Sequence, residues 1–425
     1  MEIKRNIHLQ KLIDSKHNGM IKIVTGIRRC GKSYLLFNLF CQHLKATGVD
    51  DNHILKIDLE DRRNKRLRDP DALLEYIDNK MTDNKMYYIL LDEIQHVTEF
   101  EDVLNSYLKI ENADVYVTGS NSKFLSKDVI TEFRGRGDEI RIAPLSFNEF
   151  MSVFQGNREQ ALEEYLIYGG LPKVALLSTS EKKKEYLQGL FAKTYLTDIK
   201  ERYKIKNDED LDELLNVIAS SIGGLTNPTK LENTFRSVKH SSITHTTIRT
   251  YLDMLQDAFL IEKSVRYDIK GKKYIDTPAK YYFSDLGLRN ARINFRQFEE
   301  THLMENLIYN ELRLRGMSVD VGLVVVNTKD ENGTSQRKQL EVDFVCNQGS
   351  QRCYIQSALR LPTEEKREQE LGSLKHIGDS FSKFVITEDL ISRYQDNNGI
   401  TFMNIYEFLL NPDSLFYASV AQFRQ

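Results

Sequence analysis

The sequence predicts an α/β fold with several domains, and three patterns support this prediction. Over the first 150 residues, short apolar runs rich in β-branched residues alternate with helical stretches, as in a sheet covered by helices. A glycine-rich turn joins the first of these strands to a helix. A second alternation of strands and helices begins near residue 296, and a chain of 425 residues is too long for one core.

The composition narrows the classes of partner. Hydrophobic residues make up 40% of the chain, charged residues make up 28%, and the formal net charge is −3, so binding to nucleic acid would require a local basic patch. No apolar run is long enough to span a bilayer, and the first residues lack the apolar core of a signal peptide. The four cysteines show no metal-ligand spacing and suit a reducing compartment. We therefore expect a cytoplasmic protein without a membrane partner.

The clearest motif is a phosphate-binding P-loop at 26–33. A short strand over 20–25 precedes the pattern Gly-x-x-x-x-Gly-Lys-Ser, and apolar residues at helical spacing follow it. The glycines permit a close approach to phosphate oxygens, the lysine can reach the β- and γ-phosphates, and the serine hydroxyl can ligate Mg²⁺. The residues expected to bind the nucleotide are Gly26, Ile27, Arg28, Arg29, Cys30, Gly31, Lys32, Ser33 and Tyr34. The motif predicts that the chain binds ATP with Mg²⁺.

Two acidic residues supply the second half of the predicted site. The elements expected around the P-loop are a helix over 7–16, a strand over 54–59, a helix over 71–80 and a mainly apolar strand over 86–93. The last of these strands ends in Asp92 and Glu93. An acid at the carboxyl end of a buried strand beside a P-loop is where an Mg²⁺-directing carboxylate belongs, so we assign this role to Asp92. Glu93 can then polarise the attacking water as general base.

Polar residues after the next strand, at 113–118, extend the candidate site. Ser120 or Asn121 can hydrogen-bond the γ-phosphate or the attacking water, although a serine here can equally cap a helix. Arg134 or Arg136, in a glycine-spaced loop, can stabilise phosphoryl charge within one chain or across a subunit boundary, and a solvated loop is the alternative. The candidate catalytic residues are Lys32, Glu93, Asn121 and Arg136. Oligomerisation stays open.

Six segments together carry a family resemblance. They are 26–33, 90–95, 118–121, 135–136, 144–150 and 168–172. In this order they resemble the AAA-type ATPases of bacteria and archaea that carry a C-terminal domain of unknown function, and the resemblance covers most of the chain. It implies a Walker A motif at 26–33, Walker B acids at Asp92 and Glu93, a sensor at Ser120 or Asn121, and an arginine finger at Arg136. It also implies an ATP hydrolase whose biological task is unassigned.

The middle of the chain is predicted to be mainly helical. Helices over 157–168 and 181–202, separated by the break Gly169–Pro172, resemble the helical lid that follows an AAA core. Three further helices and two strands then give a winged-helix pattern; the helices are Asp210–Ile222, Asn227–Phe235 and Ser242–Asp257. The hairpin tip carries Lys270, Lys272 and Lys273, which suit contact with nucleic-acid phosphates. The candidate recognition helix pairs Arg249 with Asp253 and Asp257, so a protein contact is the alternative.

The C-terminal third resembles the PD-(D/E)xK nuclease core. A helix over Glu299–Arg315 and strands over 319–326, 339–346, 352–357 and 383–387 are expected, followed by a helix over Ile405–Phe423. Glu305 and Asp343 match the first two acidic positions. Gln356 and Ala358 stand where an acid and a lysine belong, and Arg360 could substitute only by turning inward. Nuclease activity is therefore not expected.

These observations predict four domains and three candidate functions. The domains are an AAA-type ATPase domain at 1–150, a helical lid at 151–206, a winged-helix domain at 207–295 and a nuclease-like α/β domain at 296–425. The first function is an ATPase whose association with nucleic acid is controlled by the nucleotide. The second is an ATP-switched signalling protein that acts on a protein partner, and the third is an ATP-dependent nuclease.

Overall fold

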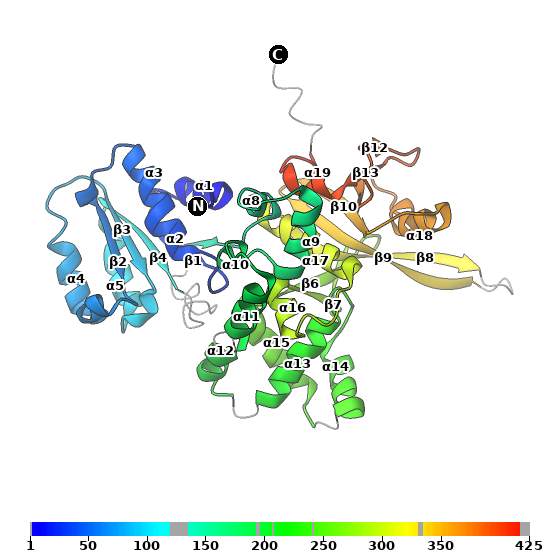
Figure 1. Cartoon of the computed structure of the whole chain (residues 1–425), viewed down its shortest axis with the longest axis horizontal. Helices are drawn as coiled ribbons and strands as arrows, with labels where there is room; N and C mark the ends of the chain where they lie inside the picture. The colour runs from blue at the N-terminus through cyan, green and yellow to red at the C-terminus, as the bar shows by residue number, and fades with distance from the viewer. Residues whose placement is uncertain are drawn as a thin grey trace, which may run out of the picture.

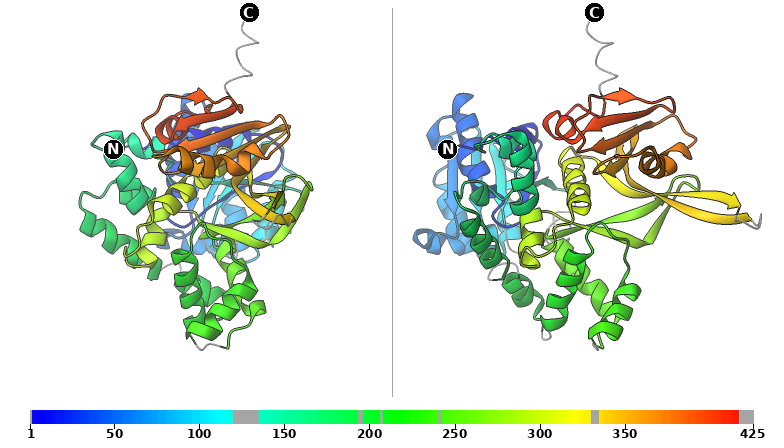
Figure 2. Two further views of the ribbon diagram at one scale, coloured as in Figure 1. Left: turned by 90° about the vertical axis from the view of Figure 1, so that its right-hand side faces the viewer. Right: turned by 45° about the vertical axis from the view of Figure 1, so that its right-hand side comes forward.

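Two β-sheets organise the computed structural model, which describes residues 2–119, 135–192, 196–205, 208–239, 242–329 and 335–416. The first sheet lies at one end of the molecule and the second at the other, with a helical region between and below them (Figure 1). Turning the molecule shows that the helices pack against both sheets (Figure 2).

The first sheet is parallel, with the strand order β2-β3-β4-β1-β5. Its strands are β1 (Ile21–Thr25), β2 (Ile54–Asp58), β3 (Tyr87–Asp92), β4 (Ala113–Thr118) and β5 (Gly137–Arg141). Every residue of β3 is buried, as expected for a strand covered by helices on both faces. The α/β fold with a parallel sheet is thus confirmed.

Helices cover this sheet on both sides. They are α1 (Asn6–Asp14), α2 (Lys32–Tyr34), η1 (Leu35–Phe40), α3 (Cys41–Ala46), η2 (Asp51–His53), η3 (Arg62–Arg68), α4 (Pro70–Asp78), η4 (Ile94–His96) and α5 (Phe100–Tyr107). The segments α2, η1 and α3 follow one another without a break and form the helix expected after the P-loop.

The middle of the chain is helical, as predicted. Its helices are α8 (Phe147–Met151), α9 (Arg158–Tyr168), α10 (Pro172–Ala175), α11 (Ser180–Leu190), α12 (Leu196–Tyr203), α13 (Asp208–Ser220), α14 (Pro228–Thr234), η6 (Phe235–Lys239) and α15 (His245–Asp257). The single helix expected over 181–202 is divided into α11 and α12. One apolar core joins Phe40 of the P-loop helix with Leu187 of α11 and Leu252 of α15, so this region packs directly on the first sheet's helices.

The second sheet has the order β12-β13-β11-β10-β9-β8-β6-β7. Its strands are β6 (Ile261–Asp268), β7 (Lys273–Phe283), β8 (Ser318–Lys329), β9 (Ser335–Gln348), β10 (Gln351–Ala358), β11 (Ser382–Thr387), β12 (Tyr394–Gln395) and β13 (Ile400–Asn404). The hairpin β6–β7, expected as a wing, also forms the edge of this sheet, because β6 pairs in parallel with β8. The strands β8 and β9 continue outward as an arm beyond the body of the molecule (Figure 2).

Four helices accompany the second sheet: α16 (Leu286–Arg292), α17 (Glu300–Leu314), α18 (Glu364–Lys375) and α19 (Ile405–Leu410). The helix expected over Ile405–Phe423 was wrong in its extent, because it ends at Leu410. Pro412 disfavours helical geometry at the preceding residue, and Asn411 is indeed extended. In the part of the chain that the structure describes, no helix has the length and apolar character needed to cross a membrane.

Candidate nucleotide site

The P-loop connects β1 to α2 in a shape that requires its glycines. Gly26 has φ 137°, and a Cβ there would clash with the backbone carbonyl oxygen of Ile142. Gly31, with φ 98°, lies directly before the helix that starts at Lys32. The Lys32 ammonium donates to the carbonyl oxygens of Gly26 at 2.9 Å and Ile27 at 3.3 Å. The Lys32 ammonium is therefore bound to carbonyl oxygens of the P-loop itself, and the oxygens of a bound phosphate would compete with them for this donor.

Asp92 lies at the carboxyl end of β3, beside the start of the P-loop helix. The Ser33 hydroxyl donates to Asp92 Oδ1 at 3.0 Å, and the Thr118 hydroxyl, at the end of β4, donates to the same oxygen. Burial raises the pKa of Asp92, and these two hydrogen bonds oppose that effect. A hydroxyl and a carboxylate at this spacing are oxygen ligands of the kind that Mg²⁺ prefers. The donor set therefore fits the metal that the motif predicts.

Glu93 has an unusual backbone for its residue type. Its φ is 54°, in the left-handed region, and its N–H donates to the Thr118 hydroxyl at 3.2 Å. Its carboxylate accepts a hydrogen bond from the Gln95 amide. Strain of this sort costs about 1–3 kcal/mol and is found where a side chain must take one direction.

A cavity of about 420 Å³ lies beside the P-loop. Lys32, Ser33 and Glu93 line one side of it, and Ile3, Leu145 and Leu176 give it an apolar side. A pocket that combines an apolar wall with a few convergent polar groups is the usual form of a small-molecule site. The cavity has the size and the division into polar and apolar parts that a nucleotide needs.

Arg5 was not predicted from the sequence, although it braces the P-loop. Its side chain is 3% exposed, and its guanidinium donates to the carbonyl oxygens of Cys30 at 2.9 Å and Ala143 at 2.6 Å. It also pairs with Glu149 at 3.2 Å. Its partners lie from 25 to 144 positions away, so no local pattern could have indicated the role.

The break Gly169–Pro172 positions another wall of the cavity. Pro172 and Lys173 of α10 line it, and the preceding Gly170 donates its N–H to the buried Asp285 carboxylate at 2.8 Å. A Cβ at Gly169, whose φ is 73°, would clash with the same carboxylate. Asp285 also caps α16 through the N–H of Leu288 at 3.0 Å. One buried carboxylate thus ties the cavity wall to the helix that follows β7.

The remaining sequence-predicted residues lie apart from this cavity or outside the described residues. Ser120, Asn121 and Arg134 fall outside them. Arg136 is exposed and precedes β5, whose opposite end, Arg141, pairs with the end of β1 that enters the P-loop. At about 3.3 Å per residue, the strand separates Arg136 from the P-loop of its own chain by roughly 15 Å.

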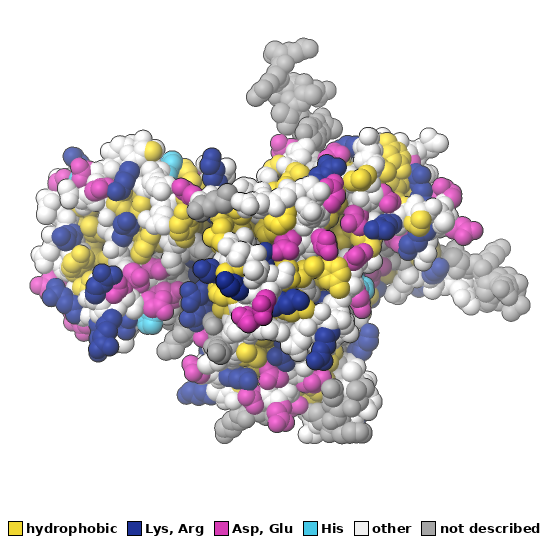
Figure 3. All heavy atoms as spheres, viewed as in Figure 1, with side chains coloured by type: hydrophobic (Ala, Val, Ile, Leu, Met, Phe, Trp, Pro, Cys, Tyr) yellow, Lys and Arg dark blue, Asp and Glu magenta, His cyan; other side chains and the backbone are white. Residues whose placement is uncertain are grey.

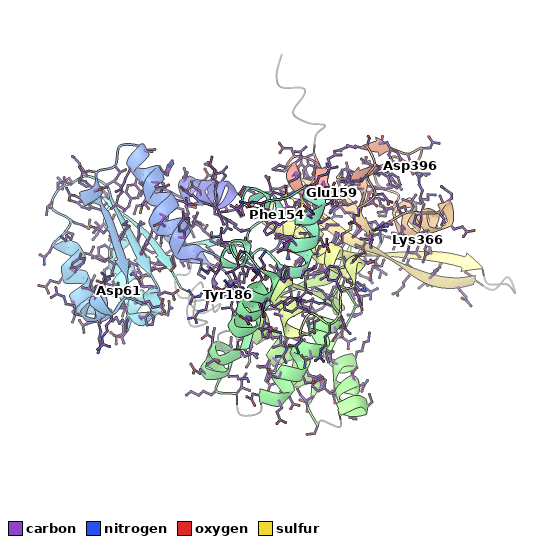
Figure 4. All side chains as sticks on the ribbon, in the orientation of Figure 1. Asp61, Phe154, Glu159, Tyr186, Lys366 and Asp396 are labelled. Carbon is purple, nitrogen blue, oxygen red and sulfur yellow. The ribbon has the colours of Figure 1, made fainter. Side chains whose placement is uncertain are left out.

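Tyr186 lies close enough to the P-loop to sense the charge of Arg29. It lies on α11, on the side toward the first sheet (Figure 4). Burial raises the pKa of its hydroxyl, and the positive charge of Arg29 in the P-loop opposes that shift. Arg28, next to it in the loop, pairs with Asp198 of α12 at 2.5 Å. The helices after the first sheet therefore contact the loop itself.

The C-terminal acids expected from the nuclease resemblance do meet, but around a lysine. Lys280 of β7 lies 2.8 Å from Glu305 Oε1 and 2.7 Å from Glu341 Oε1, and 3.8 Å from Asp343 Oδ1. Tyr282 donates to Glu305 at 2.6 Å. Within the described part of the chain, no group of three or more acidic, histidine or cysteine side chains could hold a metal ion. We call Lys280, Glu305, Glu341 and Asp343 the lysine–carboxylate cluster.

The other two nuclease positions do not complete such a site. The Gln356 amide donates to Glu370 at 3.4 Å, and Ala358 is buried. Arg360 does not turn inward: its side chain is 67% exposed and lies 3.8 Å from Glu388.

The hairpin tip carries exposed lysines, as predicted. Lys270, Lys272 and Lys273 are all exposed, and Lys270 donates to the carbonyl oxygen of Val325 at 3.1 Å. A separate groove of about 670 Å³ lies between α14 and α15 and is lined by Lys230, Arg249 and mainly neutral polar residues, among them Thr277 of β7. On the face shown in Figure 3, basic and acidic side chains are otherwise intermixed.

Known families match two parts of the chain. A family described as an AAA domain matches residues 18–151, which contain the P-loop and both acids. A domain of unknown function, DUF8612, matches residues 159–299. The resemblance implied such a domain at the C-terminal end, whereas this match covers the helical middle and the hairpin β6–β7.

Solved structures are similar only at a low level. The ORC2 protein of Aeropyrum pernix, in ADPNP and ADP complexes, is 12% identical with a TM-score of 0.38, covering 68% of this chain and 90% of that chain. The ORC1 protein of Aeropyrum pernix in complex with DNA is 11% identical with a TM-score of 0.29, covering 69% and 93%. These values are too low to support an argument about function.

Two relatives match most of the chain in sequence. An uncharacterised protein of Haemophilus influenzae is 33% identical over 414 residues, covering 96% of this chain and 98% of the relative. The uncharacterised protein MJ1544 of Methanocaldococcus jannaschii is 30% identical over 358 residues, covering 81% and 74%. The chain therefore belongs to the family of AAA-domain proteins that includes these bacterial and archaeal relatives.

Proposed function

We propose that the chain binds and hydrolyses ATP with Mg²⁺. The observation that carries this proposal is the hydrogen bond of 3.0 Å between Ser33 and Asp92. Ser33 lines the same cavity as Lys32 and Glu93, and the hydrogen bond holds the Asp92 carboxylate next to it as a second oxygen ligand. The P-loop N–H groups and Lys32 would bind the phosphates, and Ser33 and Asp92 would hold the ion. Bound Mg²⁺ would neutralise charge on the phosphates. Glu93 would accept a proton from the attacking water.

Three substitutions test these roles separately. Lys32→Ala should weaken ATP binding and abolish hydrolysis, and Asp92→Asn should lose Mg²⁺-dependent turnover. Glu93→Gln should bind ATP normally and hydrolyse it about 10²–10⁴-fold more slowly, since only proton transfer is lost. Fluorescent-nucleotide binding and phosphate release measure the two steps, with the exposed Glu111→Gln as control. Wild-type turnover in Glu93→Gln would remove that residue from the base role.

The four-domain division remains part of the proposal. The order α13, α14, α15, β6 and β7 supports a winged-helix arrangement within 207–295. The packing of α17 against β8, β9 and β10 supports a nuclease-like arrangement within 296–425. A helical lid at 151–206 is supported by Pro172 and Lys173 of α10, which line the nucleotide cavity.

A nucleotide-controlled association with nucleic acid is the first candidate for the wider role. The three exposed lysines at the hairpin tip and the polar groove beside Arg249 support it. The test compares wild type with the triple variant Lys270→Ala, Lys272→Ala, Lys273→Ala for binding to duplex DNA, single-stranded DNA and RNA at several salt concentrations. Loss of these contacts should weaken binding to all sequences and lower the salt dependence by about one unit per phosphate contact.

A signalling protein that acts on a protein partner is the second candidate. The mixed charge around Arg249, which faces Asp253 and Asp276 in one small pocket, favours it over DNA in this helix. Nucleic-acid binding that is unaffected by the triple variant, together with an ATPase rate that no nucleic acid changes, would favour this second candidate.

Cleavage of nucleic acid is not part of the proposed function. The lysine–carboxylate cluster places an ammonium group between the acids, so the position that a metal ion would need is filled by Lys280. Labelled duplex, single-stranded and branched substrates with Mg²⁺ or Mn²⁺ should stay intact, with or without ATP. Cleavage that disappears in Asp343→Ala would instead favour the ATP-dependent nuclease.

A further inference from the structure

A second, smaller cavity lies behind the P-loop. Its volume is about 90 Å³, and its walls come from α1, the end of β5, the start of β6 and α17. Ile27 of the P-loop also lines it. The cavity therefore sits where the first sheet meets the second, and nothing in the ATPase proposal uses it.

The charges around this cavity do not balance. Lys11, Arg141 and Arg313 line it together with one carboxylate, Glu262. Both arginines share that carboxylate: Arg141 pairs with Oε1 at 2.5 Å and Arg313 with Oε2 at 3.0 Å. Three cations and one anion leave a formal excess of two positive charges in this lining.

Lys11 carries the clearest sign of this excess. Burial lowers the pKa of its ammonium, and the charges of Arg141 and Arg313 lower it further. A lysine repelled by its neighbours in a partly buried site destabilises the protein unless an anion joins them.

Unused hydrogen-bonding groups line the same space. His8 is completely buried, and neither ring nitrogen has a hydrogen-bond partner among the described residues. The Ser284 hydroxyl, also on the wall, is buried and unpartnered in the same sense. Burial lowers the pKa of His8, so its ring is neutral and keeps one N–H to donate. A buried polar group without a partner costs about 1–3 kcal/mol.

We propose that this cavity binds a small tetrahedral oxyanion of the phosphate or sulfate class. Such an ion carries up to two negative charges, which matches the excess, and it accepts hydrogen bonds from Lys11, His8 and Ser284 together. A cavity of about 150 Å³ holds a benzene ring in another protein, so the 90 Å³ here suits one small oxyanion and is too small for a nucleotide. The bound ion joins α1 of the first region to α17 of the second.

The test is calorimetric titration of inorganic phosphate, with sulfate as a second probe. It uses the Lys32→Ala protein, because the P-loop would otherwise bind phosphate as well. Sodium chloride at matched ionic strength controls for general salt effects, since phosphate also stabilises proteins by exclusion from their surface. One saturable site for phosphate is expected in Lys32→Ala. The control is the double variant Lys32→Ala, Lys109→Met, which changes an exposed lysine and should keep this site.

Adding Lys11→Met to Lys32→Ala should weaken phosphate binding at least tenfold. Methionine keeps the length of the stem, and loss of the repelled charge should raise the melting temperature in phosphate-free buffer. That rise shows that the variant is folded. The absence of a saturable site, or equal phosphate affinity with and without Lys11→Met, would overturn the proposal.

Discussion

Replacing Lys280 by methionine should destabilise the protein strongly and in a pH-dependent way. The ammonium lies 2.8 Å from Glu305 and 2.7 Å from Glu341. At an effective dielectric constant of about 20, each contact is worth about 6 kcal/mol before desolvation. Burial of the ammonium offsets part of this attraction. Removal of one partner from such a group still typically costs about 3–5 kcal/mol, because the buried carboxylates are left without a counter-charge. We expect the free energy of unfolding to fall by about 3–5 kcal/mol at pH 8.

The same substitution should cost less in acid. Burial raises the pKa of Asp343, and the neighbouring Glu305 charge raises it further. Without Lys280 both carboxyl groups should bind protons more readily, and protonation removes their mutual repulsion. The loss should therefore shrink as the pH falls from 8 to 5. Added Mn²⁺ should restore part of the stability of Lys280→Met at pH 8, because a divalent ion would take the place of the ammonium.

Chemical denaturation followed by circular dichroism at both pH values measures these effects. Lys338→Met is the matched control, because Lys338 is an exposed lysine on β9, the strand that carries Glu341 and Asp343. It should change stability by less than about 0.5 kcal/mol. An equal loss at pH 5 and pH 8, or a loss no greater than that of the control, would refute the view that Lys280 neutralises the carboxylates.

Three further predictions concern the nucleotide site and its surroundings. Arg5→Ala should lower stability by about 3–5 kcal/mol and weaken ATP binding, because the Cys30 carbonyl loses its donor and Glu149 loses its ion-pair partner. Chemical denaturation and fluorescent-nucleotide titration measure the two effects. Burial raises the pKa of Asp285 to about 6, above its unfolded value near 4, so its contribution should be complete below pH 4 and lost as the pH rises through 6. Relative to Asp285→Asn, wild-type stability should fall by about 3 kcal/mol across that range. Arg136→Ala should bind ATP but hydrolyse it slowly, and mixing it with Lys32→Ala should restore turnover if the arginine acts across subunits.

Different results would contradict each of these. Unchanged melting of Arg5→Ala would show that the guanidinium contacts are dispensable. If the stability of wild type and of Asp285→Asn changed in parallel with pH, the pKa of Asp285 would not be raised in the folded protein. A lack of rescue in the Arg136→Ala mixture, with a monomer in light scattering, would exclude a role across subunits and leave that arginine with a role inside its own chain or a structural one.

The sequence predicted what local patterns encode. The P-loop, the strand that ends in Asp92 and the positions of most strands follow from residue spacing within short windows, and the structure contains them. The strands β12 and β13 were not predicted, and β9 begins at Ser335, before its predicted start at 339. Ser33 and Asp92 lie 59 positions apart, yet a strand–loop–helix order was enough to predict that they would meet.

The features that were missed depend on contacts between distant segments. Arg5 and Asp285 are single polar residues directly before α1 and α16, and Lys280 lies within β7. Their roles arise because folding buries them against carbonyls, N–H groups or carboxylates from other elements. Burial determines which partners a charged residue must have, and a single sequence does not show which charged residues are buried. The pairing of β6 with β8 was missed for the same reason, since hydrogen-bond partners on neighbouring strands leave no local signature.

That pairing decides how the protein can be taken apart. Tyr267 of β6 lies opposite Gly322 of β8, so the backbone ladder crosses the position near residue 295 where the sequence changes character. A fragment that stops there would present the unpaired N–H and C=O groups of a strand edge, which invites aggregation. The fragment that begins there would lose Lys280 and keep the carboxylates. A boundary chosen from the sequence near residue 295 therefore cuts through the hydrogen-bonded second sheet. A stable fragment would have to keep β6 and β7 together with β8.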